Sequence, residues 1–296
     1  MSDSPEIMRP GDIVQLTDPK GRHHTLTLEA GRSFHTHKGA LAHDDIIGRP
    51  EGIVVSSTSG TAYVVLRSLL EDYVLAMPRG AAVIYPKESA RIVMAAGLRP
   101  GARVIEAGAG SGALSCSLLT AVGPSGRVVS CERRADFAAV ARANVERWFH
   151  GTPDWWELRE GDLGEVAGAP GESETFDAMV LDLLDPWEHL DTASRLVRPG
   201  GVLVCYVATT TQLSRTAEAL RATGNWTEPR AEESLVRTWH LEGLAVRPDH
   251  RMIGHTAFLL ITRRLAPGTV LPPRRTRPAK GAWPERDASA ASPESQ

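Results

Sequence analysis

The stretch from Val104 to Ala113 constrains this chain more than any other part of its sequence. A short apolar run ends at the acid Glu106, and Gly108, Gly110 and Gly112 follow at alternate positions before a helical pattern begins. This order predicts a strand, a tight turn and a helix N-terminus. Glycine suits such a turn because it lets the backbone bend sharply and a ligand approach closely. The stretch therefore predicts a binding loop for a nucleotide-containing cofactor.

The glycine spacing fits two classes of enzyme. Gly108, Gly110 and Ala113 nearly match the dinucleotide fingerprint of dehydrogenases, which allows alanine at its third position. Gly108, Gly110 and Gly112 match the loop of S-adenosylmethionine-dependent methyltransferases equally well. Glu106 favours the methyltransferase, because an acid at the strand end can hold the methionine ammonium group, whereas a pyrophosphate gains nothing from it. A loop that binds no ligand is the remaining alternative.

Two further acids follow the next strand-like segments. Glu132 comes directly after the apolar run Arg127–Cys131, where it would accept hydrogen bonds from both ribose hydroxyls. Dehydrogenases share that feature, so it does not separate the two classes. Asp162 follows the third segment, Trp156–Arg159, where methyltransferases bind the adenine amino group. The series as a whole favours S-adenosylmethionine as the cofactor.

The composition is that of an ordinary globular protein. The 296 residues are 42% hydrophobic and 23% charged, enough for one large or two modest domains. The formal net charge of −3 means that nucleic-acid binding would need a local basic patch. We expect no membrane segment and a cytoplasmic location, because no apolar run has transmembrane length and the first residues lack a signal peptide's apolar stretch. Cys116, Cys131 and Cys205 lie in apolar segments and are expected to be reduced core residues.

The pattern of the chain changes near residue 70. Residues 11–67 alternate polar and apolar side chains between turn signals, which predicts a small barrel or curled sheet. Such a module serves either nucleic-acid binding or packing and dimerisation. His35, His37 and His43 cluster in one of its loops, but they lack a convincing fourth ligand, so we expect no metal site.

From about residue 72 helical and strand patterns alternate, as in a doubly wound α/β sheet. Helices are expected over Lys87–Leu98, Ala113–Val122, Ala135–Trp148 and Thr211–Ala222, and a final antiparallel pair of strands over Thr238–Leu244 and Thr256–Thr262. We therefore predict an N-terminal β-rich, barrel-like domain over residues 1–70 and a Rossmann-like methyltransferase domain over residues 71–265. Residues 266–296 are expected to form a disordered, basic and proline-rich tail.

Three side chains, two of them at strand ends, point to the chemistry. Asp182 ends the fourth strand and Tyr206 the fifth, while Tyr85 precedes the helix before the cofactor strand. Ligands of such sheets lie beyond the carboxyl ends of the strands, so these residues are expected around the methyl group, although a tyrosine there more often serves packing. An acid at this place suits methylation at N1 of adenine. The N1 lone pair is already available, so the reaction needs no strong base. A carboxylate that is hydrogen-bonded to the exocyclic amino group stabilises the cationic product.

These residues belong to segments through which the chain resembles the bacterial and archaeal tRNA (adenine-58-N1)-methyltransferase family, over residues 10–265. The segments are Phe34–Gly39, Tyr85–Lys87, Glu106–Leu114, Leu181–Trp187, Gln212–Ser214 and Gly254–Phe258. The resemblance implies methyl transfer from S-adenosylmethionine to N1 of adenosine 58 in the tRNA T-arm. It also implies a homotetramer, and we expect an actinobacterial source. The chain departs from the family pattern at Glu88, usually Asp, and at Ser68, where proline is expected.

The resemblance also assigns residues. Asp182 takes the role of the catalytic aspartate, and Tyr85 and Tyr206 those of active-site tyrosines. Cofactor contacts are expected from Glu106, Gly108, Gly110, Ser111, Gly112, Ala113, Leu114, Glu132, Arg133, Asp162, Leu163 and Asp182.

Two other functions remain open at this stage. A non-catalytic RNA-binding subunit would not need Glu106, Glu132 and Asp182. A protein isoaspartyl-type methyltransferase has a similar cofactor loop, but its anionic acceptor would be repelled by Asp182.

The tRNA is a polyanion, so the chain needs basic side chains near its cleft. A basic rim is predicted from the N-terminal module and four C-terminal arginines, Arg247, Arg251, Arg263 and Arg264. The alternative is that these arginines pair with Glu232, Glu233 or Asp249.

Overall fold

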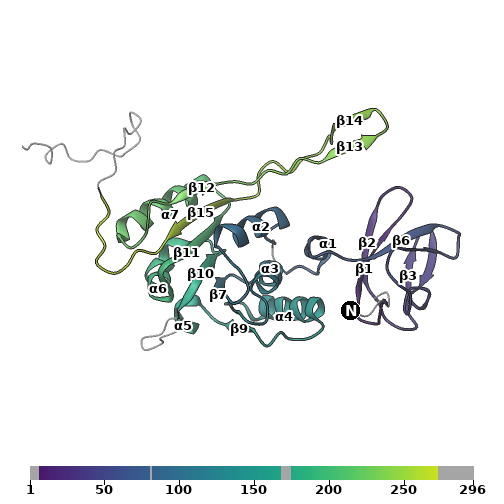
Figure 1. Ribbon diagram of the computed structural model, residues 1–296, viewed down its shortest axis with the longest axis horizontal. Helices are drawn as coiled ribbons and strands as arrows, with labels where there is room; N and C mark the ends of the chain where they lie inside the picture. Colours follow the sequence, from purple (N-terminus) through teal and green to yellow (C-terminus); the bar gives the residue numbers. More distant parts are fainter. Residues whose placement is uncertain (1–6, 81, 168–174, 273–296) are drawn as a thin grey trace, which may run out of the picture.

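A computed structural model describes residues 7–80, 82–167 and 175–272 of the protein. The two largest sheets lie along the long axis of the molecule, one from the N-terminal quarter of the chain and one from the rest (Figure 1). In the described part, no helix is long and apolar enough to cross a membrane. The three cysteines are buried free thiols, as predicted.

The N-terminal part is built from short antiparallel strands, as predicted. They are β1 (Ile13–Thr17), β2 (His23–Thr27), β3 (Ser33–Thr36), β4 (Gly39–Ala42), β5 (Ile53–Ser56) and β6 (Ala62–Arg67), with the 3₁₀ turn η1 (His43–Asp45) after β4. Four of them form a sheet in the order β2-β1-β6-β5, and β3 pairs with β4 in a separate hairpin. Alternate strand residues, among them Leu16, Tyr63 and Val65, enclose a small core of their own.

The second sheet has seven strands. The parallel ones are β7 (Arg103–Ala107), β8 (Arg127–Glu132), β9 (Trp156–Glu160), β10 (Phe176–Leu181) and β11 (Val197–Val207), and β12 (Arg230–Glu232) and β15 (Phe258–Arg263) form an antiparallel edge. Their order is β12-β15-β11-β10-β7-β8-β9. This mostly parallel sheet confirms the predicted Rossmann-like fold.

Helices cover both faces of this sheet (Figure 1). They are α1 (Leu70–Ala76), α2 (Pro86–Ala95), α3 (Ala113–Val122), α4 (Ala135–Phe149), α5 (Leu163–Val166), α6 (Leu190–Leu196) and α7 (Thr210–Thr223), with the 3₁₀ turn η2 (Pro186–His189). Side chains of successive strand residues pack into the two cores on opposite faces of the sheet. Val104 packs with α1 to α4, and Ile105 packs with α5 to α7. Because both faces are covered, the parallel strands are nearly continuous apolar runs.

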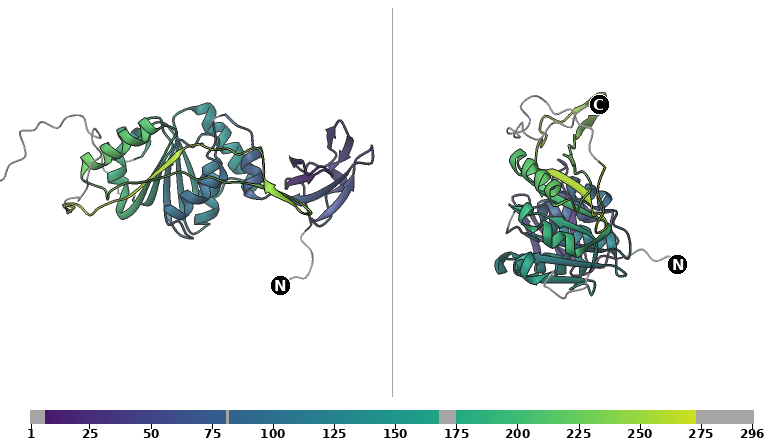
Figure 2. Two further views of the ribbon diagram at one scale, coloured as in Figure 1. Left: turned by 90° about the horizontal axis from the view of Figure 1, so that it is seen from above. Right: turned by 90° about the vertical axis from the view of Figure 1, so that its left-hand side faces the viewer.

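The predicted pairing of the last two strands is wrong. Strand β13 (Trp239–Glu242) pairs instead with β14 (Ala245–Pro248), its direct neighbour in the chain. Strand β15 pairs with β11 and β12 inside the main sheet. The two-residue link at Gly243 favours a hairpin, and alternation of side chains alone does not identify a strand's partner. The result is an arm, residues 233–257, that projects from the sheet (Figure 2).

Candidate active site

A cavity of about 310 Å³ lies beyond the carboxyl ends of β7, β8 and β10. Parallel strands bring these ends to one edge, so residues far apart in the sequence meet there. Six of the predicted cofactor residues line it: Gly108, Glu132, Arg133, Asp162, Leu163 and Asp182. The cavity is also lined by His189, which the sequence reasoning missed because no motif marks its turn.

The glycine loop is packed against the strand that carries Asp182. Gly108 has a φ of +87°, and a Cβ atom on it would lie 2.1 Å from the carbonyl oxygen of Asp182. Gly110 and Gly112 also have positive φ, at +55° and +79°. The Gly108 N–H donates to the carbonyl of Cys131 at 3.0 Å, which ties the loop to β8. Glycine at position 108 therefore sets the distance between the cofactor loop and the proposed catalytic acid.

We expect Gly108→Ala to lower the free energy of unfolding by about 2–4 kcal/mol, from the positive φ and the clash together. Because the clash is with Asp182 itself, methyl transfer should also slow. Gly97→Ala is the matched control, since Gly97 has a φ of +64° and a Cβ atom on it would meet nothing within 4 Å. Denaturant titration of both variants measures the difference. Equal losses of stability would contradict the contact with Asp182.

Glu132 holds the loop from the next strand. Its side chain is 6% exposed, and its two oxygens accept from the Gly110 N–H at 2.9 Å and the Arg134 N–H at 3.1 Å. Each carboxylate oxygen can accept a second hydrogen bond. The observed contacts therefore leave room for two ribose hydroxyls, and Glu132 fits the proposed cofactor.

Glu106 is the most deeply buried acid of the site, at 1% exposure. One oxygen accepts from the hydroxyls of Ser115 and Ser130, and the other, Oε2, has no hydrogen-bond partner among the described residues. Burial raises the pKa of Glu106 to about 7, and the nearby carboxylates of Asp182 and Glu132 add to the rise. A buried carboxylate with an unsatisfied oxygen fits a cationic group, such as the methionine ammonium of the cofactor.

This raised pKa predicts that cofactor affinity depends on pH. Without cofactor, Glu106 keeps its proton up to about pH 7, whereas its ordinary pKa is 4.5. The folded protein therefore loses stability as pH rises from about 4.5 to 7, where the unfolded chain is ionised and the folded one is not. A cationic ligand favours the ionised acid, so binding releases a proton and tightens with rising pH. We expect affinity to increase up to about tenfold per pH unit between pH 5.5 and 7. Calorimetry across this range tests it, and Glu106→Gln should flatten the dependence.

Three predicted cofactor residues lie behind the loop instead of lining the cavity. The Ser111 hydroxyl accepts from the Gly80 N–H at 3.2 Å, and the Ser111 carbonyl accepts from Asn144 at 2.9 Å. Ala113 and Leu114 are buried in the core with α3. These three residues support the glycine loop from behind, and their contact with the cofactor stays a prediction.

The proposed catalytic residues meet at the same edge. Leu181 and Cys205 are partners in the β10–β11 register, so Asp182 and Tyr206 follow side by side. Burial raises the pKa of Asp182 to about 7, and among the described residues its carboxylate has no hydrogen-bond donor. Burial also raises the pKa of the Tyr206 phenol, and the charges of Glu88, Asp182 and Tyr85 add to the rise. The Asp182 carboxylate is therefore free to accept from a substrate.

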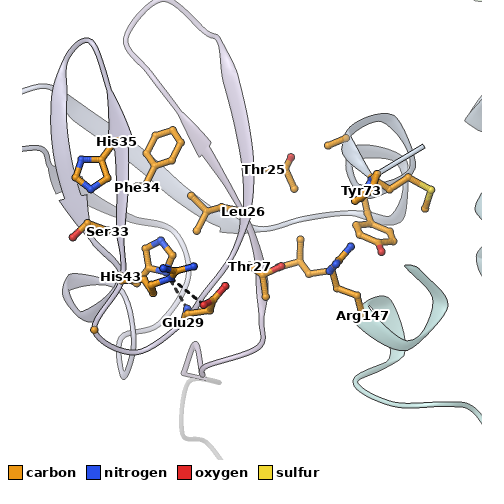
Figure 3. A pocket seen from close by; sticks show the side chains of 16 residues that line it. Thr25, Leu26, Thr27, Glu29, Ser33, Phe34, His35, His43, Tyr73 and Arg147 are labelled. Atoms are coloured by element: carbon orange, nitrogen blue, oxygen red, sulfur yellow. Dashed lines mark hydrogen bonds and ion pairs between the residues drawn. The ribbon is translucent and has the colours of Figure 1, made fainter. Parts of the chain in front are cut away.

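A larger cleft, of about 920 Å³, lies elsewhere, between the N-terminal sheet and helices α1 and α4 (Figure 3). Arg32, His35 and His43 line one side, and Tyr73 and Arg147 the other. His43 accepts from the Glu29 N–H through Nδ1 at 2.9 Å, which gives it a structural role. Within the described ranges, no group of three metal-ligating side chains is found.

Two of the four arginines predicted at the cleft are elsewhere. Arg263 is opposite Val202, at the far end of the sheet from the site, and donates to the Gly200 carbonyl. Arg264 donates to carbonyls of Ser194 and Asn225. The prediction is wrong for both, because β15 runs antiparallel and its C-terminal end lies away from the site. Arg247, on β14, and Arg251, just beyond it, belong to the arm.

Comparison with known proteins places the chain among RNA-modifying enzymes. The family described as tRNA methyltransferase complex GCD14 subunit matches residues 61–253, and the TrmI-like N-terminal family matches residues 7–55. A tRNA (adenine(58)-N(1))-methyltransferase from Thermus thermophilus is 35% identical over 257 residues, 86% of this chain and 97% of the relative.

Solved structures agree with this placement. A tRNA (m1A58) methyltransferase from Aquifex aeolicus has a TM-score of 0.75 and 25% identity, over 88% of this chain and all of the other. An S-adenosylmethionine-dependent O-methyltransferase from Thermotoga maritima has a TM-score of 0.81 and 29% identity, over 88% and 95%. The tRNA methyltransferase family model matches more than half of the chain, and the Thermus thermophilus relative is 35% identical over nearly its full length. The chain belongs to the tRNA (adenine-58-N1)-methyltransferase family.

Proposed function

We propose that the protein transfers a methyl group from S-adenosylmethionine to N1 of adenosine 58 in the T-arm of tRNA. The observation that carries this is the Asp182 carboxylate, which lines the cofactor cavity, has no donor among the described residues and follows β10 beside the end of β11 that carries Tyr206. Family membership supports the same reaction. The cofactor, when bound, supplies an electrophilic methyl group.

Asp182 performs the central task in the proposed mechanism. Its carboxylate accepts from the exocyclic amino group of the adenine and so directs N1 toward the methyl group. Positive charge grows on the ring as N1 is methylated, and a fixed anion stabilises it more in the transition state than in the ground state. Glu132 and Glu106 hold the ribose and the ammonium group, which fixes the other reactant. Tyr85 and Tyr206 flank the acceptor and exclude water.

Transfer of tritium from labelled cofactor to tRNA tests the reaction class. Label should enter tRNA, and bulk protein and small molecules serve as controls. Label in protein alone would favour the isoaspartyl-type enzyme, and no transfer would favour a non-catalytic subunit. The comparisons support neither alternative, and fungal relatives bear the name catalytic subunit.

Arg247 and Arg251, on the arm, are the proposed phosphate contacts. Two acids that could have paired with them are engaged elsewhere: Glu232 pairs with Arg91, and Glu233 contacts His255. Charge reversal at both arginines should weaken tRNA binding. It should also make the plot of log affinity against log salt concentration less steep, by about 0.7–0.9 in slope for each lost phosphate contact. A salt titration of tRNA affinity measures this, with cofactor affinity and melting temperature as controls. A lower melting temperature with an unchanged slope would indicate a structural role.

The proposed assembly is a homotetramer. Its support is the set of exposed apolar side chains on the arm, which a second copy of the chain would cover: Trp239, Leu241, Leu244 and Val246. Light scattering of the full chain tests the oligomeric state. A cytoplasmic location is supported by the three free thiols, which suit a reducing compartment.

A further inference from the structure

The pairing of β10 with β11 ends just before the proposed catalytic residues. Leu181 and Cys205 are the last partners in the register of these two strands. Asp182 and Tyr206 lie one residue beyond this pair. After Asp182 the chain leaves the sheet in a turn, residues 183–185, which lines the cofactor cavity. A contact outside the sheet is therefore needed to hold this turn beside the end of β11.

The side chain of Gln212 makes such a contact. Gln212 lies in the first turn of α7, and its Nε2 donates to the Leu184 carbonyl at 2.9 Å. Its Oε1 accepts from the Thr209 N–H at 3.1 Å. Leu184 lies two residues after Asp182 in the chain. Thr209 lies three residues after Tyr206. One amide group thus joins the turn after β10 to the segment after β11.

The partners of this amide fix its orientation. The Thr209 N–H is a donor, so it must face the amide oxygen of Gln212. The Leu184 carbonyl is an acceptor, so it must face the amide nitrogen. The Leu184 side chain is 75% exposed and gives the turn little anchorage by packing. The hydrogen bond from Gln212 therefore supplies a hold on the turn that this side chain does not.

Two tasks meet in Gln212, and only one of them needs an amide. Its oxygen completes a capping box with Thr209 at the start of α7. Glu serves this position of a capping box as well as Gln, because the cap uses only an oxygen. The Leu184 carbonyl, in contrast, requires a donor, which a carboxylate lacks. The contact with Leu184 is therefore the physical reason for an amide at this position.

We infer that Gln212 is a positioning residue for methyl transfer, which fixes the turn after Asp182 relative to the segment after Tyr206. The inference rests on the proposed function, in which these two residues face the acceptor. Loss of the bridge frees the turn beside the catalytic acid, so the step that should suffer is methyl transfer within the bound complex.

Gln212→Glu separates the bridge from the helix cap. Single-turnover methylation of a tRNA transcript, at saturating cofactor and tRNA, should slow about fivefold to tenfold, the upper scale for one hydrogen bond. The melting temperature should stay at the wild-type value, because Glu completes the capping box. Thr211→Glu is the matched control, since it adds the same charge at the next, exposed position of α7 and should keep the wild-type rate. Gln212→Met, which is uncharged and of similar length, replaces the Glu variant if that protein does not fold.

A double-mutant cycle tests the path through Asp182. If Gln212 acts by placing that carboxylate, Gln212→Glu should slow the Asp182→Asn variant much less than it slows wild type. Multiplied losses, a wild-type rate for Gln212→Glu, or equal slowing by Thr211→Glu would each overturn the inference. Without methylation of tRNA by the wild type, the proposed function fails and the inference with it. Methylation by wild type and by Gln212→Glu at the same rate overturns the inference alone.

Discussion

Asp182→Asn is expected to slow methyl transfer in a single turnover by about 10²-fold or more, the scale for one preorganised electrostatic contact. The amide keeps the size of the side chain but removes the anion that stabilises the methylated ring. It also presents a donor to an amino group that needs an acceptor. Since Asp182 contributes charge rather than shape, cofactor affinity should change little.

Asp185→Asn is the matched control for this prediction. Asp185 lies three residues further on and lines the same cavity, but it is exposed. Rapid-quench measurement of one turnover compares the two variants with wild type. A near wild-type rate for Asp182→Asn would remove the catalytic assignment, and a larger loss at Asp185 would move it there.

Glu132→Ala should weaken S-adenosylmethionine binding by at least tenfold. Each charge-assisted hydrogen bond to the ribose is worth about 1.5–3 kcal/mol. The structure adds a second reason, because Glu132 also accepts from the Gly110 N–H and so holds the cofactor loop in shape.

Glu160→Ala is the control, since Glu160 is the partner of Glu132 in the β8–β9 register but is exposed at the strand end. Calorimetry of both variants gives the comparison. Unchanged cofactor affinity in Glu132→Ala would contradict the ribose assignment, and tight binding of a nicotinamide dinucleotide would revive the dehydrogenase.

The acids at the edge of the sheet could be predicted because the position of each depends only on residues close to it in the sequence. Glu106, Glu132 and Asp182 each end an apolar run, and parallel strands place such ends together whatever the loops between them do. The helix after the glycine loop was predicted over Ala113–Val122, as it occurs in the structure. The end of β7, the loop glycines and the start of α3 all lie between Glu106 and Ala113.

Contacts between distant segments were not predictable in this way. Lys87 was part of a recognised motif, but its partner Thr256 lies 169 residues away, across the arm. The arm itself was misassigned because side-chain alternation identifies a strand without its partner. Arg263 and Arg264 were placed at the cleft on sequence proximity, and the antiparallel direction of β15 moves them to the other end of the sheet.

Identification of the methylated atom tests the central claim most directly. The full chain is incubated with S-adenosylmethionine and a tRNA transcript, and the product is digested and analysed by mass spectrometry. A matched transcript with uridine at position 58 serves as the control. The proposed function predicts 1-methyladenosine at position 58 of the first transcript and no methylation of the second at that position. Methylation at N6 or on another nucleotide, with adenosine 58 unchanged, would contradict it.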